Sequence, residues 1–187
     1  IFSCTYLHDG DGMRDVCLGA DSVDGGWMNK KMMIAGLIIA GLAIASALVD
    51  RKVEAAERQA DLEQYIEILC APDICPEFVE ALIERESRWN PEAVNGDCIG
   101  LMQISERWHK ERMRALGAKD LKDPFDNIDV GIDYLRELFE RYEDPGMVLM
   151  VYNGDSRAKD LQATGNLSEY AEWILNRSAE LEREHDK

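Results

Sequence analysis

The hydrophobic positions in the middle of this chain repeat with the period of a helix. Within and just before the stretch EALIERESRWNP, residues 80–91, the side chains of Val79, Leu82 and Ile83 fall on one helical face. The next position on that face is Glu86, where another apolar side chain is expected. Its carboxylate is either the partner of a nearby arginine in a buried ion pair, or a group whose burial raises its pKa for acid–base chemistry. Periodicity alone does not choose between these interpretations.

Helical patterns fill most of the chain around and after this segment. The helix that carries Glu86 is predicted from Pro76 to about Trp89, where NPEAVNGD supplies turn residues. No internal repeat and no run of alternating strand pattern is found, so the fold class is predicted as mainly α. Further helices are predicted over residues 105–116, over 123–142 with Ile128, Ile132, Leu135, Phe139 and Tyr142 on one face, from Pro145, and from the cap-like Ser168 nearly to the C-terminus.

An uncharged apolar run of about 18 residues, from Met32 to Val49, follows the basic residues NKK. It predicts a membrane-targeting segment over residues 28–50. Two interpretations stay open: a cleaved secretory signal with ASA, Ala45 to Ala47, as the cleavage site, or an uncleaved N-terminal anchor, which we favour. A buried core helix is the weaker interpretation because the run is apolar on all sides.

Residues 1–27 form a Gly- and Asp-rich leader for which we expect no fold of its own. Met28 begins the pattern of a targeting segment, so we expect it to be the native start. The positive-inside rule then places NKK in the cytoplasm and the chain after Val49 outside it. Residues 51–69, charged and rich in helix formers, are predicted as a helical stalk. Residues 70–187 are predicted as the functional domain, extracytoplasmic and either membrane-anchored or secreted.

Composition and charge narrow the function classes. The chain has 187 residues, 46% of them hydrophobic, which is enough for a packed core. With 21 Lys and Arg against 37 Asp and Glu, the formal net charge is −16, which argues against nucleic acid as a partner. The histidines His8, His109 and His185 are scattered and none stands at ligand spacing from a cysteine, so neither a metal nor a cofactor is expected.

Several separated motifs together resemble a known family. The chain contains ERES followed by RWNPEAVNGDCIGLMQIS, then DPFDNIDVGIDYL, then VLMVYNGD, then EYAEWIL. In this order they resemble the soluble-lytic-transglycosylase-type catalytic domain of the lysozyme-like superfamily, over roughly residues 70–184. The resemblance implies a lysozyme-like helical fold. It also implies cleavage of peptidoglycan between N-acetylmuramic acid and N-acetylglucosamine.

The resemblance assigns the chemistry to one carboxylate. Glu86 matches the family's acid/base residue, which protonates the glycosidic oxygen and then takes the proton of the muramoyl C6 hydroxyl. That hydroxyl closes a 1,6-anhydro ring, and no water is consumed. The substrate's acetamido group is expected to stand in for a second carboxylate. Tyr170 matches the tyrosine whose hydroxyl orients Glu86.

The resemblance also implies the residues that bind the sugar. In GLMQI, Gly100 fits where backbone passes close to the sugar, Met102 is expected to line the cleft, and Gln103 offers a donor and an acceptor. Tyr152 is expected to pack against the sugar and Asn153 to bind it. Without the resemblance, plain core packing would explain GLMQI and the tyrosine. The expected substrate-binding residues are Ser87, Gly100, Met102, Gln103, Tyr152, Asn153 and Tyr170, and Asn127 of DPFDN is interpreted as a turn or cap residue.

Two aspartates and three cysteines lie beside these motifs. Asp97 and Asp155 are expected to be turn residues, although either one as an extra base would favour hydrolysis over ring closure. Cys75 and Cys98 border the cleft in the fold that the resemblance implies, so a disulfide between them is feasible outside the membrane. Cys70 with Cys75 is the competing pair.

Three functions are weighed. The leading hypothesis is a peptidoglycan lytic transglycosylase that acts at the cell wall. The second is a hydrolytic muramidase on the same fold, and the third is a non-catalytic wall-binding or scaffold module of a transenvelope machine. The expected partners are peptidoglycan glycan strands, the membrane through residues 32–49, and secretion or conjugation machinery.

Overall fold

The computed structural model describes residues 28–71 and 73–185, with side chains described from residue 33 onward. The chain divides into two compact units, Ile1–Val49 and Asp50–Lys187, and each is described by itself. The predicted leader, with Cys4 and Cys17, lies outside the described residues.

The first unit contributes an apolar part of helix α1 (Met28–Cys70), whose side chains from Met33 to Val49 are exposed. Within the described residues, α1 is the one helix whose length and composition suit a membrane span, and the apolar window that qualifies is not buried. A cleaved signal and an uncleaved anchor both fit such a helix.

The last turns of α1 belong to the core of the second unit. Leu62, Ile66 and Cys70 recur every four residues and are buried, with Ile66 and Cys70 completely inaccessible. Tyr65 fixes the same turns to the domain because its hydroxyl donates to Asp129 at 2.7 Å. The packed domain therefore begins inside the segment that was predicted as a stalk over residues 51–69.

Helix α2 (Pro76–Ser87) carries the apolar stripe that the sequence predicts. Val79, Leu82 and Ile83 are all completely buried. The helix ends two residues earlier than expected because Arg88 takes a left-handed conformation, with φ of 53°, and its N–H bonds to the carbonyl of Glu84. This end positions Glu86 in the last helical turn.

Three short strands, β1 (Val94–Asn95), β2 (Cys98–Ile99) and β3 (Ile104–Ser105), form an antiparallel sheet in the order β1-β2-β3. Ile99 pairs with Val94 on one side and with Ile104 on the other. The sheet was not predicted, because two-residue strands are too short to produce an alternating pattern.

Five further helices complete the domain, and aspartates cap two of them. The Asp123 carboxylate accepts hydrogen bonds from two backbone N–H groups and Asp144 accepts one, each directly before a proline at the first helical position. The predicted helices are confirmed except for their exact ends, whereas α6 was not predicted. The helices are α3 (Glu106–Leu116), α4 (Pro124–Tyr142), α5 (Pro145–Tyr152), α6 (Ala158–Ala163) and α7 (Glu169–His185).

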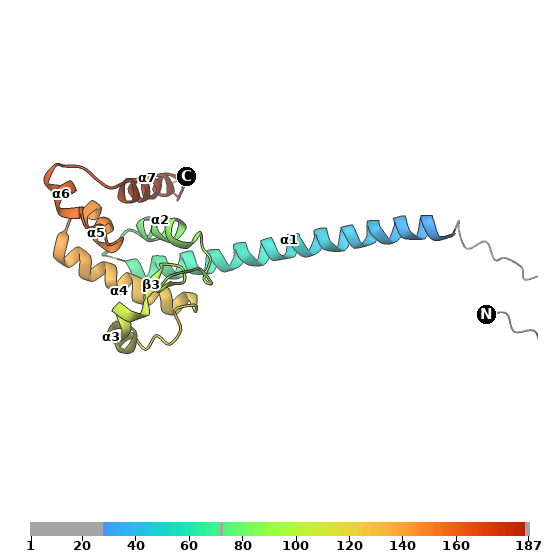
Figure 1. The fold of residues 1–187 in the computed structure, drawn as a ribbon, viewed down its shortest axis with the longest axis horizontal. Coiled ribbons are helices and arrows are strands. Elements are labelled where there is room, and N and C mark those ends of the chain that lie inside the picture. The colour runs from blue at the N-terminus through green and yellow to red at the C-terminus, as the bar shows by residue number, and fades with distance from the viewer. Residues whose placement is uncertain (1–27, 72, 186–187) are drawn as a thin grey trace, which may run out of the picture. The chain divides into compact units, whose positions relative to one another are not determined.

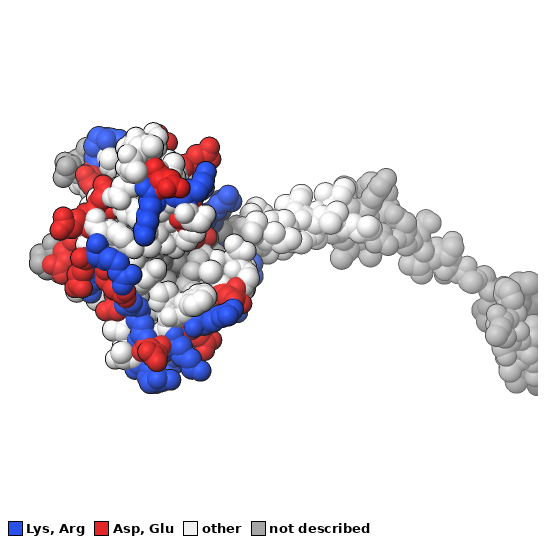
Figure 2. Space-filling model, turned by 60° about the vertical axis from the view of Figure 1, so that its left-hand side comes forward, with Lys and Arg blue, Asp and Glu red and all other residues white. Residues whose placement is uncertain are grey.

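The helices of the second unit pack around one apolar core. Helices α2 and α7 lie along each other, α4 packs against α3 and α5, and α5 also contacts α7 (Figure 1). The prediction of a mainly α domain is confirmed. The surface mixes charges: Figure 2 shows Lys and Arg side chains interspersed with Asp and Glu around a hollow on the face in view.

Candidate active site

The Glu86 carboxyl is the group with the strongest case for chemistry. Its side chain is half-buried, and this burial raises its pKa, although the hydrogen bond from Tyr170 and the charge of Arg85 pull the pKa back. Among the described residues, no ion pair includes Glu86. The α2 glutamate that pairs with an arginine is Glu84, whose carboxylate lies 2.8 Å from Arg177. The geometry therefore favours an acid–base group over a structural ion pair.

Tyr170 reaches Glu86 from helix α7. Its hydroxyl donates to the Glu86 carboxylate, and burial followed by the Glu86 charge holds the pKa of Tyr170 well above its ordinary value. The phenol thus stays protonated and serves as a donor. Ser168 fixes the start of the helix, because its hydroxyl accepts a hydrogen bond from the N–H of Ala171. The structure brings Tyr170 and Glu86 together from positions 84 residues apart.

The GLMQI segment forms the turn between β2 and β3. Gly100 has a φ of 81°, and a Cβ there would overlap the Asn127 side chain and the Leu121 carbonyl. A glycine is therefore required at position 100 by close packing within the protein, whether or not a sugar binds nearby. Gln103 donates through its amide nitrogen to the carbonyls of Ala93 and Gly100, at 3.2 Å and 3.0 Å. Its side-chain oxygen has no partner in the described part of the chain.

Met102 does not line the cleft, contrary to the expectation from sequence. The Met102 side chain is completely buried. It packs so closely against Gly131 that a Cβ on residue 131 would overlap the Met102 sulfur. A buried thioether fills the space that the glycine leaves in α4. Met102 contributes its backbone to the site: its carbonyl accepts from the Tyr152 hydroxyl at 2.7 Å, and its N–H donates to Asn127 at 2.8 Å.

Asn127 has a larger part than the turn or cap residue that the sequence suggests. Its side chain is completely buried, accepts from Met102 N–H, and donates to the carbonyls of Ile99 and Leu121, both at 2.8 Å. One amide thus satisfies two backbone groups of the β2–β3 segment, at Ile99 and Met102, and one at Leu121 in the connection between α3 and α4. DPFDN gives no direct sign of this, because the partners lie outside the motif.

Tyr152 and Asn153 end helix α5 beside this loop. Burial, followed by the charge of Glu86, holds the pKa of Tyr152 well above its ordinary value, so its hydroxyl is a donor at neutral pH. Its ring lies 5.4 Å from that of Tyr134, which lies 4.5 Å from the ring of His109. Asn153 is exposed and free to meet a ligand.

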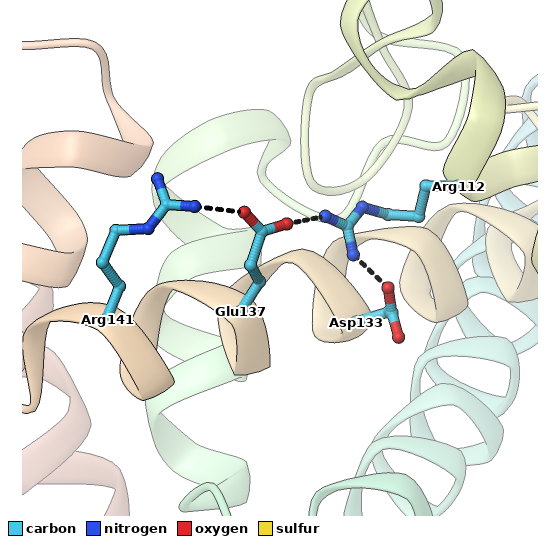
Figure 3. Close-up of polar contacts among 4 residues, drawn as sticks. All are labelled: Arg112, Asp133, Glu137 and Arg141. Carbon is cyan, nitrogen blue, oxygen red and sulfur yellow. Dashed lines mark hydrogen bonds and ion pairs between the residues drawn. The ribbon is translucent and has the colours of Figure 1, made fainter.

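A polar network ties α3 to α4 behind these aromatic rings. Arg112 of α3 pairs with both Asp133 and Glu137 of α4, and Glu137 also pairs with Arg141 at 2.8 Å (Figure 3). The Arg112 guanidinium stands 5.4 Å from the centre of the Tyr134 ring. This network fixes the position of the ring that supports Tyr152.

The remaining polar candidates stand apart from the Glu86 carboxyl. The Ser87 hydroxyl donates to the carbonyl of Ile83 at 3.3 Å. Asp155 pairs with Arg157 inside its own turn, as expected of a turn residue. Asp97 is exposed between β1 and β2. Neither aspartate is among the groups that shift the pKa of Glu86.

The described cysteines, Cys70, Cys75 and Cys98, are free thiols, so neither the Cys75–Cys98 pair nor the competing Cys70–Cys75 pair is formed in this structure. Cys75 instead donates to Glu77 at 2.9 Å and to Glu182 at 3.4 Å. Burial raises the pKa of Cys70 and of Cys75 to about 12, which keeps both thiols protonated.

Two charged residues of α2 are not among the site residues predicted from the sequence. Arg85 lies close enough to lower the pKa of Glu86 and stands 6.0 Å from the Tyr170 ring centre. Glu80 is 5% exposed, and burial raises its pKa to about 7. Neither lies on the apolar stripe, so helical periodicity gave no signal for them.

Comparison with known proteins agrees with this geometry. The model of the family described as "Transglycosylase SLT domain" matches residues 63–173. A transglycosylase of Enterobacteria phage PRD1 is 35% identical over 80 residues, which are 42% of this chain and 29% of the phage protein.

A solved structure supports the fold. The 70 kDa soluble lytic transglycosylase of Escherichia coli aligns with a TM-score of 0.52 and 21% identity over 64% of this chain and 23% of that protein. The lysozyme-like fold prediction is therefore confirmed. This chain spans less than a third of the length of either relative. Because the family model covers more than half of the chain, this chain belongs to the transglycosylase SLT domain family.

Proposed function

We propose that the domain is a lytic transglycosylase that cleaves peptidoglycan between N-acetylmuramic acid and N-acetylglucosamine and leaves 1,6-anhydromuramoyl ends. Membership of the SLT family supports the transglycosylase class. The observation that carries the proposal is the Glu86 carboxyl: it is half-buried, its pKa is raised, and it accepts a hydrogen bond from Tyr170.

In the first step Glu86 acts as an acid. Its carboxyl donates a proton to the oxygen that joins the two sugars while the bond from that oxygen to the muramoyl C1 breaks. An acid that works near neutral pH must keep its proton there, and burial of Glu86 acts in this direction. The Tyr170 hydroxyl holds the carboxyl in place and limits the rise of its pKa.

In the second step the same carboxylate acts as a base. It takes the proton from the muramoyl C6 hydroxyl as the C6 oxygen bonds to C1, so the proton count balances and no water enters. This route needs no second carboxylate, since the acetamido group of the substrate supports C1. The positions of the two candidate aspartates support this single-carboxylate route. The Asp155 carboxylate is paired with Arg157, and Asp97 is exposed in the turn between β1 and β2.

Residues around the loop and α5 are proposed to hold the sugars. The unpartnered oxygen of Gln103 and the exposed Asn153 offer hydrogen bonds, and the Tyr152 ring offers an apolar surface. Ser87 is proposed to contribute backbone surface, since its hydroxyl is bonded within its helix. Gly100 is buried against Asn127 and Leu121, so its proposed part is to shape the turn that carries Gln103. The proposal does not include the buried Met102 side chain.

The apolar part of α1 is proposed to tether this domain to a membrane. Residues 32–49 would cross it, the basic NKK would remain in the cytoplasm, and the domain would face the wall outside. The proposed division is a leader over residues 1–27 and an anchor or signal over residues 28–50. The first, exposed part of residues 51–69 then leads into the wall-active domain.

The test is the chemistry of the released fragments. The full chain in detergent is incubated with purified peptidoglycan beside Glu86→Gln and the exposed control Glu106→Gln, and soluble muropeptides are analysed by mass spectrometry. We expect anhydro-ended fragments that fall by roughly 100-fold or more in Glu86→Gln alone. Reducing ends lost in that variant would make the protein a muramidase. An absence of fragments from all three proteins would favour a scaffold.

A further inference from the structure

A pocket of about 600 Å³ is lined by residues of helices α2 and α7, by Gln59 of α1, and by the turn after α2. Its volume lies in the range of sites that take small organic ligands. Three arginines, one glutamate and two tryptophans line it: Arg85, Arg88, Arg177, Glu84, Trp89 and Trp173. In a chain with a net charge of −16, a pocket with this excess of cations stands out.

Two of the three arginines have their charge available. Arg177 is already engaged, since it pairs with Glu84 at 2.8 Å and also with carboxylates of its own helix. Arg85 and Arg88 form no ion pair and no side-chain hydrogen bond with any described residue. Guanidinium groups without a partner in a concave site are suited to bind an oxyanion.

The end of α2 directs the pocket's side chains. Arg88 and Trp89 both take left-handed conformations, with φ of 53° and 61°, immediately after the last helical residue. This bend brings both side chains to the pocket that Trp173 and Arg177 line from α7. Two successive non-glycine residues rarely adopt left-handed conformations, so the surrounding structure must hold this turn in place.

Arg85 connects the pocket to the proposed catalytic carboxyl. Its guanidinium lies 5.4 Å from the Trp173 ring centre and 6.0 Å from the Tyr170 ring centre. Tyr170 in turn donates to Glu86. Glu86 itself does not line the pocket, so Arg85 is the residue that connects the pocket with the proposed catalytic carboxyl.

We propose that this pocket binds an oxyanion beside the active site, carried either by the peptide of the glycan strand under attack or by a free anion such as phosphate. The inference rests on the proposed function, because muramoyl residues bear a peptide with carboxylates next to the bond that is cleaved. The tryptophans would cover the apolar parts of such a peptide, and Arg88 would pair with a carboxylate.

The test uses the full-length protein in detergent and compares its action on glycan strands with and without peptide. Wild type, Arg88→Gln and the exposed control Arg107→Gln, which lies on α3 outside the pocket, are assayed on glycan strands and on the same strands freed of peptide by an amidase. We expect Arg88→Gln to raise the half-saturating concentration of peptide-bearing strands about tenfold, the loss of one charged hydrogen bond. Turnover of peptide-free strands should not change.

Binding without turnover gives the second readout. In the inactive Glu86→Gln protein, tryptophan fluorescence is titrated with an N-acetylmuramoyl peptide, with the same peptide amidated at its carboxylates, and with inorganic phosphate. A response to the free carboxylates that Arg88→Gln abolishes supports the strand as the source. A response to phosphate alone, lost in the same variant, supports a free anion.

The proposal is overturned if Arg88→Gln and Arg107→Gln behave alike in every assay. Failure of the pocket is distinguishable from failure of the proposed function. If the two arginine variants behave alike while wild type still cleaves peptide-free strands and Glu86→Gln does not, the oxyanion site is rejected and the proposed transglycosylase activity is retained.

Discussion

At the scale of single residues, burial of acids has two different consequences in this protein. Glu86 and Glu80 stand on the same helix, and burial raises the pKa of both carboxyls. Glu86 has a hydroxyl partner and an arginine nearby, whereas the charges that act on Glu80 come mainly from Glu63, Glu77 and Glu67, opposed by His185. Burial with a donor suits an acid–base group, and burial among other acids is a stability cost at high pH.

Tyr170→Phe tests the first case. The hydroxyl lowers the pKa of Glu86, so its removal raises that pKa further. Activity that needs protonated Glu86 is lost as pH rises through this pKa, so the alkaline limb of the rate profile should move to higher pH. The maximum rate should fall about tenfold as the carboxyl loses its orientation. A limb that moves to lower pH, or an equal shift in the control Tyr142→Phe, would contradict the role.

Glu80→Gln tests the second case. The pKa of Glu80 rises from its ordinary value of 4.5 to about 7 in the folded state. Folding therefore favours the protonated form, and this contribution is complete below 4.5 and is lost as pH rises through about 7. At pH 8 the neutral amide should stabilise the domain by about 3 kcal/mol, with little change at pH 4.5. Thermal unfolding at both values checks this, with the exposed Glu140→Gln as control.

At the scale of elements, one amide joins two segments that the sequence presents separately. Asn127→Ala removes two hydrogen bonds to the backbone of the β2–β3 region and one to the carbonyl of Leu121 before α4, and it leaves buried groups unpaired. We expect it to destabilise the domain by about 2 to 4 kcal/mol, measured by urea unfolding, and to speed hydrogen exchange at the Met102 amide. Asn176→Ala, at an exposed position of α7, is the control. An unchanged Met102 amide would refute the role of Asn127 in holding the loop.

The helices and strands also differ in how far they could be predicted from the sequence. Prolines after capping aspartates and the stripe of Val79, Leu82 and Ile83 are local signals, so the helices were predictable. The depth of Met102 and the three bonds of Asn127 depend on groups 25 or more residues away or in other elements, and no local pattern encodes them. The two-residue strands were missed because they are set by pairing and not by alternation.

At the scale of the whole molecule, an acidic domain of the SLT family is joined to an apolar helix. If residues 32–49 span a membrane, lysines in their centre must lower membrane retention, because each costs roughly 2.5 to 3.5 kcal/mol there. We expect the full chain to remain with membranes after carbonate extraction, and Ile39→Lys with Leu42→Lys to be released. Ala56→Lys lies on the same helix beyond the apolar run and should be retained.

The same preparation separates the anchor from a cleaved signal. An uncleaved anchor gives an intact mass that includes residues 32–49, whereas cleavage after Ala47 gives a soluble product that begins shortly before Asp50. Leu62 and Ile66 lie beyond that point and stay with the domain in both cases. The cleaved product should therefore keep the stability of the full chain, so cleavage would change where the protein acts and not whether it folds. A cleaved product that unfolds more readily would show that the apolar helix stabilises the domain.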